Sequence, residues 1–165
     1  MRRTVHSHST LKFDPRRGSQ LVEAGLVLLP LFALLFIAMD AAWAAFVKAT
    51  LEHAVREGVR YAVTGQTSGQ SGQVASIEAF VKDRALGLLD GDQAGTLSVE
   101  FLDPVTLTQA TIAPVNQGGN LVTVSVTNYS VTPLAPLLRS NDPLSITVNA
   151  ADKIEPSPGG IPPTL

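Results

Sequence analysis

Glu23 is the residue that most needs a chemical explanation, because it places a carboxylate inside a long apolar run. The run extends from Leu21 to Val47 and is interrupted only by Glu23 and Asp40, with Arg17 shortly before it. A charge inside a membrane is costly and is usually paired with an opposite charge. Two interpretations follow: Glu23 faces a cation inside the bilayer, or it lies at the bilayer rim near Arg17, solvated by headgroup water.

Other residues whose types suggest reactivity are few and poorly spaced. The chain has no cysteine, and its three histidines are His6 and His8 near the N-terminus and His53 in an amphipathic segment. Asp90–Gly95 ("DGDQAG") resembles the start of a calcium loop, but the twelfth position holds Phe101 instead of glutamate. The sequence shows neither a set of serine, histidine and aspartate suited to catalysis nor a phosphate-binding glycine loop after a strand. We therefore expect no enzyme activity, no metal site and no cofactor.

The apolar run has the length of a membrane span. Leu21 and Asp40 lie 19 residues apart, which is about 28 Å along a helix and close to the thickness of a bilayer core. The two acids can therefore lie at opposite rims of the bilayer.

The charge distribution predicts the orientation of this span. Five basic residues and one acidic residue precede Ser19, whereas seven basic and thirteen acidic residues follow Gly18. Because basic flanks stay on the cytoplasmic side, we expect a single-pass inner-membrane protein with a cytoplasmic N-terminus and an extracytoplasmic C-terminal domain. The net charge of −2, without a basic face, argues against a nucleic-acid partner.

A cleaved secretory signal is the competing interpretation of the N-terminal region. Ala42–Ala44 ("AWA") resembles the small-residue cleavage site of such signals. The apolar part is longer than the usual core of a signal peptide. The helical pattern also continues past the proposed cleavage site, so we favour an intact membrane helix.

Beyond the apolar run, the sequence becomes an amphipathic helix. Apolar or small residues recur at spacings of three and four, and the stripe comprises Val47, Leu51, Ala54, Val55, Gly58, Val59 and Ala62. Charged residues occupy the opposite face: Lys48, Glu52, Arg56 and Arg60. No proline or glycine separates this segment from the span. We predict one helix over residues 19–63, bent at Pro30.

The rest of the chain predicts a small α+β domain. Residues 64–75 form a Gly/Ser/Gln linker, Ser76 is the expected N-cap of a short helix ending near Gly91, and residues 156–165 form a disordered Pro/Gly-rich tail. Alternating apolar residues predict strands at residues 97–101, continuing through 105–107, at 121–131 and at 144–151. The predicted fold is a long transmembrane stem helix packed against a small antiparallel sheet with one short helix, and residues 76–155 form the outer domain.

Several motifs occur in an order typical of one family. They are "RGSQLVEA" from Arg17, Pro30, Asp40 and "AVREGVRYAV" from Ala54. The architecture resembles that of type IV pilins and pseudopilins, and the motifs resemble those of the TadE-like minor pseudopilins of tight-adherence (Flp) pilus systems. The resemblance is firm over residues 17–63 and loose over residues 76–155. Major Flp pilins carry tyrosine after the glutamate, whereas this chain has Ala24, so it is not the major pilin.

The resemblance implies roles for individual residues. Gly18 is the last residue of a cytoplasmic leader (residues 1–18) cut by a prepilin peptidase, and Ser19 is the first mature residue. Glu23 is then the fifth, and in pilins this glutamate pairs with the N-terminal amine of a neighbouring subunit. The other implied assembly residues, which would contact partner subunits, are Asp40, Arg56, Glu57 and Arg60.

Two functions from different classes remain open on the sequence. The first is a structural pseudopilin of a Flp pilus or related secretion machine, whose partners are the bilayer, other pilin or pseudopilin subunits, a prepilin peptidase and the pilus assembly platform. The second is a secreted or anchored small β-rich binding module with an N-terminal signal sequence. A secreted binder loses everything up to about Ala44, whereas a pseudopilin keeps the helix whole.

Overall fold

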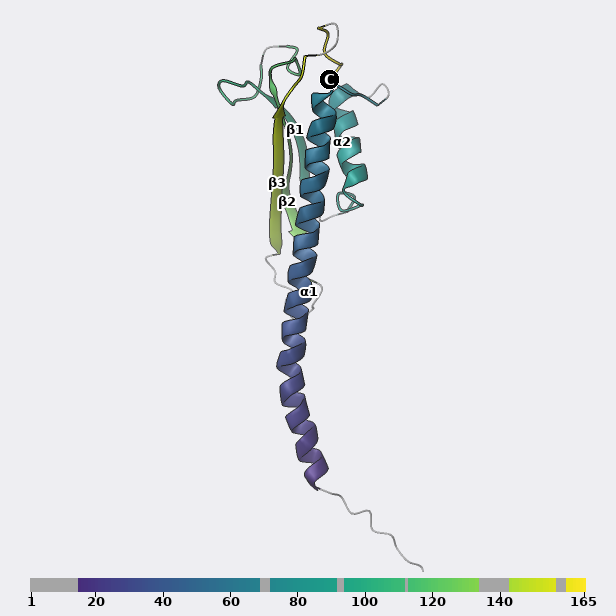
Figure 1. Ribbon diagram of the computed structural model, residues 1–165, viewed down its shortest axis with the longest axis vertical. Helices are drawn as coiled ribbons and strands as arrows, with labels where there is room; N and C mark the ends of the chain where they lie inside the picture. The colour runs from purple at the N-terminus through teal and green to yellow at the C-terminus, as the bar shows by residue number, and fades with distance from the viewer. Residues whose placement is uncertain (1–14, 69–71, 92–93, 112, 134–142, 157–159) are drawn as a thin grey trace, which may run out of the picture. The chain divides into compact units, whose positions relative to one another are not determined.

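The computed structural model describes residues 15–68, 72–91, 94–111, 113–133, 143–156 and 160–165. Most of the predicted leader, with His6 and His8, lies outside these residues. The elements are α1 (Pro15–Val63), α2 (Gly72–Arg84), β1 (Thr96–Leu102), β2 (Leu121–Val131) and β3 (Leu144–Lys153), labelled in Figure 1. The predicted α+β class is thus confirmed. The chain divides into two compact units, Met1–Ala38 and Met39–Leu165.

The first unit contributes only helix over its described residues. α1 begins at Pro15, where the fixed φ of proline suits the first helical position. Every residue from Gly18 to Ala38 is exposed, including the leucines and phenylalanines of the apolar run, and the helix continues through Pro30. An apolar helix that is exposed on all sides needs lipid or partner helices around it.

The second unit contains an antiparallel sheet in the order β1-β2-β3. Val124 is paired with Val99 of β1, and Val126 with Val148 of β3. The register between β2 and β3 shifts between Val126 and Tyr129. Alternation along β2 buries its three central valines, as the sequence predicted. They form one apolar face of the sheet.

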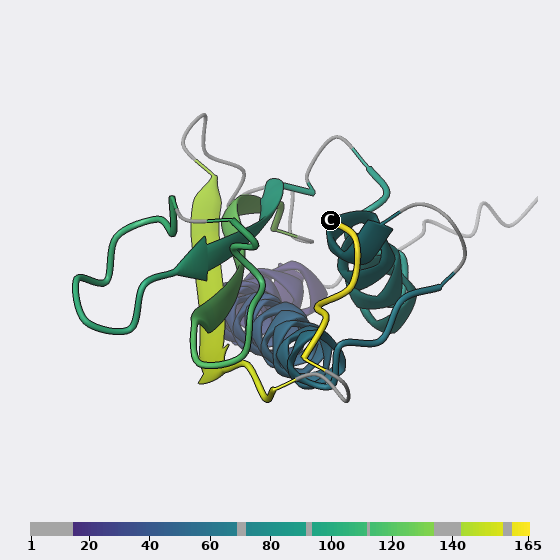
Figure 2. The ribbon, with the colours of Figure 1, turned by 90° about the horizontal axis from the view of Figure 1, so that it is seen from above.

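The predicted stripe of α1 packs against this face. All seven stripe positions are buried, and four of them are completely inaccessible apolar side chains: Val47, Leu51, Ala54 and Val55. Ile77 and Val81 of α2 complete the same core. Figure 2 shows the sheet on one side of α1 and α2 beside the helix. Each fully buried aliphatic side chain stabilises the domain by roughly 1.5–3 kcal/mol.

Gly58 is the point where α1, α2 and the sheet come closest. A Cβ added at this position would overlap the side chain of Val81 on α2 and lie 3.9 Å from a methyl group of Val124 on β2. Glycine is therefore required here for close approach rather than for backbone conformation. The sequence placed Gly58 on the buried stripe but did not identify what it contacts.

α2 begins earlier and ends earlier than the sequence predicted. It starts at Gly72, inside the expected linker, and ends at Arg84 rather than near Gly91. Ser76 is not an N-cap, because its hydroxyl lies in the helix and donates to the carbonyl of Gly72 at 2.7 Å. The helix ends early because Leu86 and Gly87 adopt left-handed φ values of 54° and 78°.

The predicted continuation of the first strand through residues 105–107 is also wrong. After β1, the Asp103 carboxylate accepts hydrogen bonds from the backbone N–H groups of Val105 at 2.8 Å and Thr106 at 2.9 Å. These bonds, with that from Thr106 the stronger cause, lower the pKa of Asp103 from its ordinary value. Val105 and Leu107 are exposed in the resulting turn, because this local side-chain bonding competes with strand pairing.

Two buried amides bind the C-terminal segment, which the sequence predicted to be disordered. Asn116 donates to the side-chain oxygen of Gln73 and to the carbonyl of Pro163, each at 2.7 Å. Gln73 donates through its side chain to Ala62 O at 3.1 Å and through its backbone to Thr164 O at 2.7 Å. Residues 160–165 are therefore held by hydrogen bonds that periodicity does not reveal, while residues 157–159 lie outside the described part.

Asn116→Ala should destabilise the outer domain, because Asn116 is only 1% exposed and its loss leaves two buried acceptors without this donor. The expected decrease in the free energy of unfolding is about 1–3 kcal/mol, measured by urea titration. Asn149→Ala is the control, since Asn149 is exposed on β3. Equal effects of the two substitutions would contradict a role for the buried network.

Candidate functional site

Gly18, Ser19 and Glu23 lie on exposed positions of α1 in the first unit. Ser19 and Glu23 are one helical turn apart, so they lie on the same side of the helix with an axial separation of about 6 Å. A Cβ built on Gly18 meets no atom within 4 Å. Packing within this chain therefore does not require a glycine at position 18, and any requirement must come from another molecule.

Asp40 is the first residue of α1 after Gly18 that is not fully exposed. It belongs to the second unit, whereas Glu23 belongs to the first. Seventeen helical residues separate the two carboxylates, so α1 does not bring them together. Asp40 is half-buried at the point where α1 begins to contact the outer domain.

Arg56, Glu57 and Arg60 lie on the outward face of α1. Arg56 pairs with Glu52 at 3.0 Å, Lys48 reaches the same carboxylate at 3.8 Å, and Arg60 pairs with Glu57 at 3.7 Å. The arginine and lysine side chains are 60–80% exposed. Ion pairs this exposed contribute roughly 0.3–0.5 kcal/mol each. The fold gains little from these charges, so they are available to a partner.

An aromatic column stands beside these charges. The rings of Tyr61 and Phe80 stack with centroids 4.6 Å apart and planes inclined by 13°, and the Arg84 guanidinium lies 5.0 Å from the Phe80 centroid. Together with Glu57 and Arg60, Tyr61 and Phe80 line a shallow hollow of about 310 Å³. We call Arg56, Glu57, Arg60, Tyr61 and Phe80 the stem surface. Phe80 escaped the sequence reasoning, because its contact with Tyr61 joins two separate helices.

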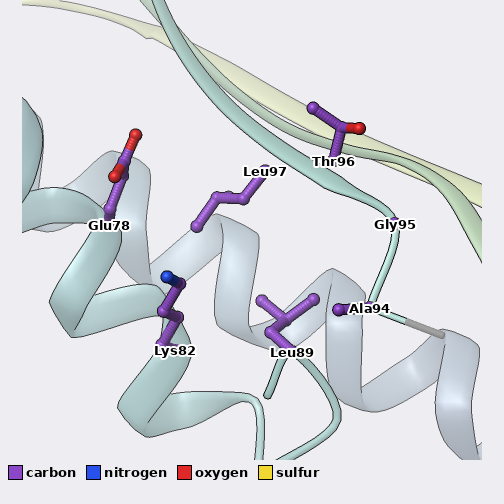
Figure 3. A pocket seen from close by; sticks show the side chains of 7 residues that line it. All are labelled: Glu78, Lys82, Leu89, Ala94, Gly95, Thr96 and Leu97. Atoms are coloured by element: carbon purple, nitrogen blue, oxygen red, sulfur yellow. The ribbon is translucent and has the colours of Figure 1, made fainter. Parts of the chain in front are cut away.

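A second hollow lies between α2 and the start of β1, with a volume of about 260 Å³. Glu78 and Lys82 border it from α2, and Leu89 and residues 94–97 border it from the chain that leads into β1 (Figure 3). Over the described residues, no three histidine, aspartate or glutamate side chains are grouped to hold a metal ion. Asp92, the third residue of the calcium-like segment, lies outside those residues.

The exposed apolar helix and the stem surface fall within one stretch of sequence that is shared with other proteins. Residues 18–60 match the family model of TadE-like proteins. The TadE-like resemblance drawn from the motifs is thereby confirmed over this segment. The match implies a component associated with the Tad pilus, in a family that is structural rather than enzymatic. No curated protein and no solved structure matches the chain.

The structure divides the conserved-looking "REGVRYA" stretch of the TadE-like segment and its flank into two groups. Gly58, Tyr61 and Ala62 face the outer domain, since Gly58 admits α2, Tyr61 stacks on Phe80, and Ala62 is buried and accepts a hydrogen bond from Gln73. Arg56 and Arg60 point to solvent. Half of the motif therefore has a packing role, and the other half presents charge.

The TadE-like segment also contains a candidate membrane span. Over the described residues, α1 from Gly18 to Val63 is the one helix long and apolar enough to cross a bilayer, and its most apolar part is not buried in the protein. This finding rests on length and composition, and it is consistent with membrane anchoring.

Proposed function

We propose that this chain is a membrane-anchored TadE-like minor pseudopilin, a structural component in the assembly of a tight-adherence Flp pilus or a related secretion machine. The observation that carries the proposal is the position of the family match. Residues 18–60 coincide with a helix whose first part exposes only apolar surface apart from its ends and whose second part anchors a folded domain. A subunit that assembles through its helix needs both parts.

The proposed topology follows from the charges that flank α1. Residues 1–18 are a cytoplasmic leader, residues 19–63 combine the span with the stem, and the outer domain lies beyond the inner membrane. Five basic residues before Ser19 support this orientation. The outer domain begins with α2 at Gly72 rather than at Ser76, so the linker is shorter than its composition suggested.

In the proposed assembly, a prepilin peptidase cuts after Gly18 and creates an amine at Ser19. Glu23 then pairs with the corresponding amine of a neighbouring pilin or pseudopilin subunit. The pair is favourable because an opposite charge offsets much of the cost of holding each group in a medium of low dielectric. Since Ser19 and Glu23 lie on the same side of α1, the pairing sets how far one helix is displaced along the other.

The stem surface is the proposed contact with a further subunit or with the assembly platform. Its charges are exposed and its aromatic rings are already ordered by stacking, so a partner binds without having to order them. Asp40 is proposed as an additional contact at the outer end of the span.

Glu23→Ala should leave leader removal intact but lower the amount of protein recovered with partner subunits. The peptidase cuts upstream of Glu23, whereas the Ser19 amine of a neighbour loses its counter-charge. Cross-linking in membranes followed by mass analysis measures both effects. Glu23→Gln should behave like alanine, and Glu100→Ala, which removes an exposed carboxylate of the outer domain, should not. Normal cross-linking of Glu23→Gln would remove charge pairing from the proposal.

N-terminal sequencing of the membrane-bound protein tests the proposed function directly. A chain that begins at Ser19 supports the pseudopilin. A chain that begins near Ala45 instead establishes the secreted binding module. An intact leader in cells with an active prepilin peptidase leaves only an uncleaved anchor and removes the amine from the explanation of Glu23.

A further inference from the structure

An apolar groove lies between α1 and the end of α2, on the second unit. Its volume is about 480 Å³, and its lining is formed by Phe46, Ala49, Thr50, His53, Asp83, Arg84 and Leu86. Two large apolar side chains on its border are open to solvent, since Phe46 is 49% exposed and Leu86 is 72% exposed. The groove is separate from the stem surface, and the proposed pairing of Glu23 does not use it.

Leu86 is held in an unfavourable conformation at the border of this groove. Its φ of 54° lies in the left-handed region, which costs a residue with a Cβ roughly 1–2 kcal/mol relative to the ordinary helical region. The preceding residue, Ala85, is buried and hydrogen-bonded to the carbonyl of Val81 at 3.0 Å. The turn thus anchors Ala85 in the core and directs an apolar side chain outward. Backbone strain combined with an exposed leucine is typical of a contact site.

Trp43 and Phe46 mark where this end of the outer domain meets the bilayer. Their rings stack with centroids 5.6 Å apart, and Trp43 is half-buried. Twenty helical residues separate Glu23 from Trp43, about 30 Å along the axis, which is the thickness of a bilayer core. With Glu23 at the inner rim, Trp43 lies at the outer rim, where tryptophan is enriched. Phe46 then follows about 4.5 Å farther out, within the headgroup layer.

The charges around the groove suit the same environment. Lys82 and Arg84 lie in the last turn of α2 and Lys48 follows Phe46 on α1, whereas Asp83 pairs with Arg84 at 3.9 Å and Glu52 with Lys48 at 3.8 Å. Long basic side chains beside apolar ones can cover an apolar surface while their charged ends reach lipid phosphates.

We propose that the surface formed by Phe46, Leu86 and the groove between them rests in the headgroup layer of the bilayer that α1 enters. The occupant of the groove is lipid, because the surface continues directly from the exposed apolar part of α1. This contact fixes the height and the rotation of the outer domain above the membrane. The inference rests on the proposed membrane anchoring and goes beyond it.

The chain is well suited to a direct test, because it has no cysteine and a single tryptophan. Leu86→Cys carries an environment-sensitive fluorophore, and the full-length protein is placed as one copy per nanodisc of phosphatidylcholine containing a nitroxide-headgroup lipid. Leu107→Cys is the matched control, since Leu107 also has a φ of 54° and is 64% exposed. It follows β1, whose seven residues place it about 20 Å farther along the sheet.

We expect the label at position 86 to be quenched several-fold more strongly than the label at position 107, with Trp43 quenched in both proteins. Quenched Trp43 with equal, weak quenching of the two labels overturns the headgroup contact and leaves the anchor intact. Unquenched Trp43 overturns the anchoring itself. Protection of position 86 only in discs with several copies means that another copy fills the groove, and it also overturns the proposal. If Leu86→Cys does not fold, Ala49→Cys labels the same groove and the same comparison decides.

Discussion

Gly18→Val should block removal of the leader and leave a precursor about 2 kDa heavier than the mature chain, since all 165 residues weigh 17.4 kDa. The proposed peptidase must bring its catalytic groups close to the backbone after position 18, and a glycine offers no side chain to obstruct them. A branched side chain at this position should prevent that approach. Immunoblotting of membranes from cells with an active prepilin peptidase measures the ratio of precursor to product.

Gly25→Val is the matched control for this experiment. Added Cβ atoms at Gly18 and at Gly25 both meet nothing within 4 Å, so neither substitution introduces a clash within the chain. Both also place the same β-branched residue in the same helix, with the same small effect on helix stability. Equal processing of the two variants would mean that Gly18 is not the cleavage determinant.

Val59→Asp should unfold the outer domain or nearly so. Val59 is 4% exposed and belongs to the core formed by α1, α2 and the sheet. An aspartate there buries a charge without a partner, which costs about 3–5 kcal/mol, a large part of the stability of a small domain. Urea titration of the full-length protein in detergent, followed by near-ultraviolet circular dichroism of Tyr61 and Tyr129, measures the shift in midpoint.

Val105→Asp provides the comparison for that measurement. The substitution is chemically identical, but Val105 is 87% exposed in the turn after β1. Its effect should therefore stay within about 0.5 kcal/mol of the unsubstituted protein. Similar midpoints for the two variants would show that the stripe of α1 is not a core surface.

The stem helix could be predicted from the sequence because its signal is local. Seven stripe positions repeat with the helical period, and each of them is buried in the structure. The three strands followed from alternation for the same reason. The boundaries of α2 did not, because they depend on Gln73, whose side chain is satisfied by Ala62 eleven residues earlier and by Asn116 far along the chain. Contacts over such separations leave no periodic trace.

The candidate site divides along the same line. Gly18, Ser19 and Glu23 form a short motif that the sequence displays, and the structure adds that the fold itself makes no use of them. The roles of these residues depend on other molecules, so they stay predictions. The stem surface was predicted only for its charged members, because the stacking of Tyr61 on Phe80 requires two helices to meet at Gly58. A single glycine within a charged helix face gives little hint of that meeting.

The hydrogen bonds that hold residues 163 and 164 have a practical consequence for anyone who modifies this chain. Epitope tags and reporter enzymes are usually appended after the last residue, where they would pull on the carbonyls bound by Asn116 and Gln73. A truncation that removes this segment would leave both amides short of acceptors. The exposed turn of Val105–Leu107 offers a safer insertion point, since its side chains contribute nothing to the core. Localisation experiments on this chain should therefore carry their reporter inside the sequence, in that turn.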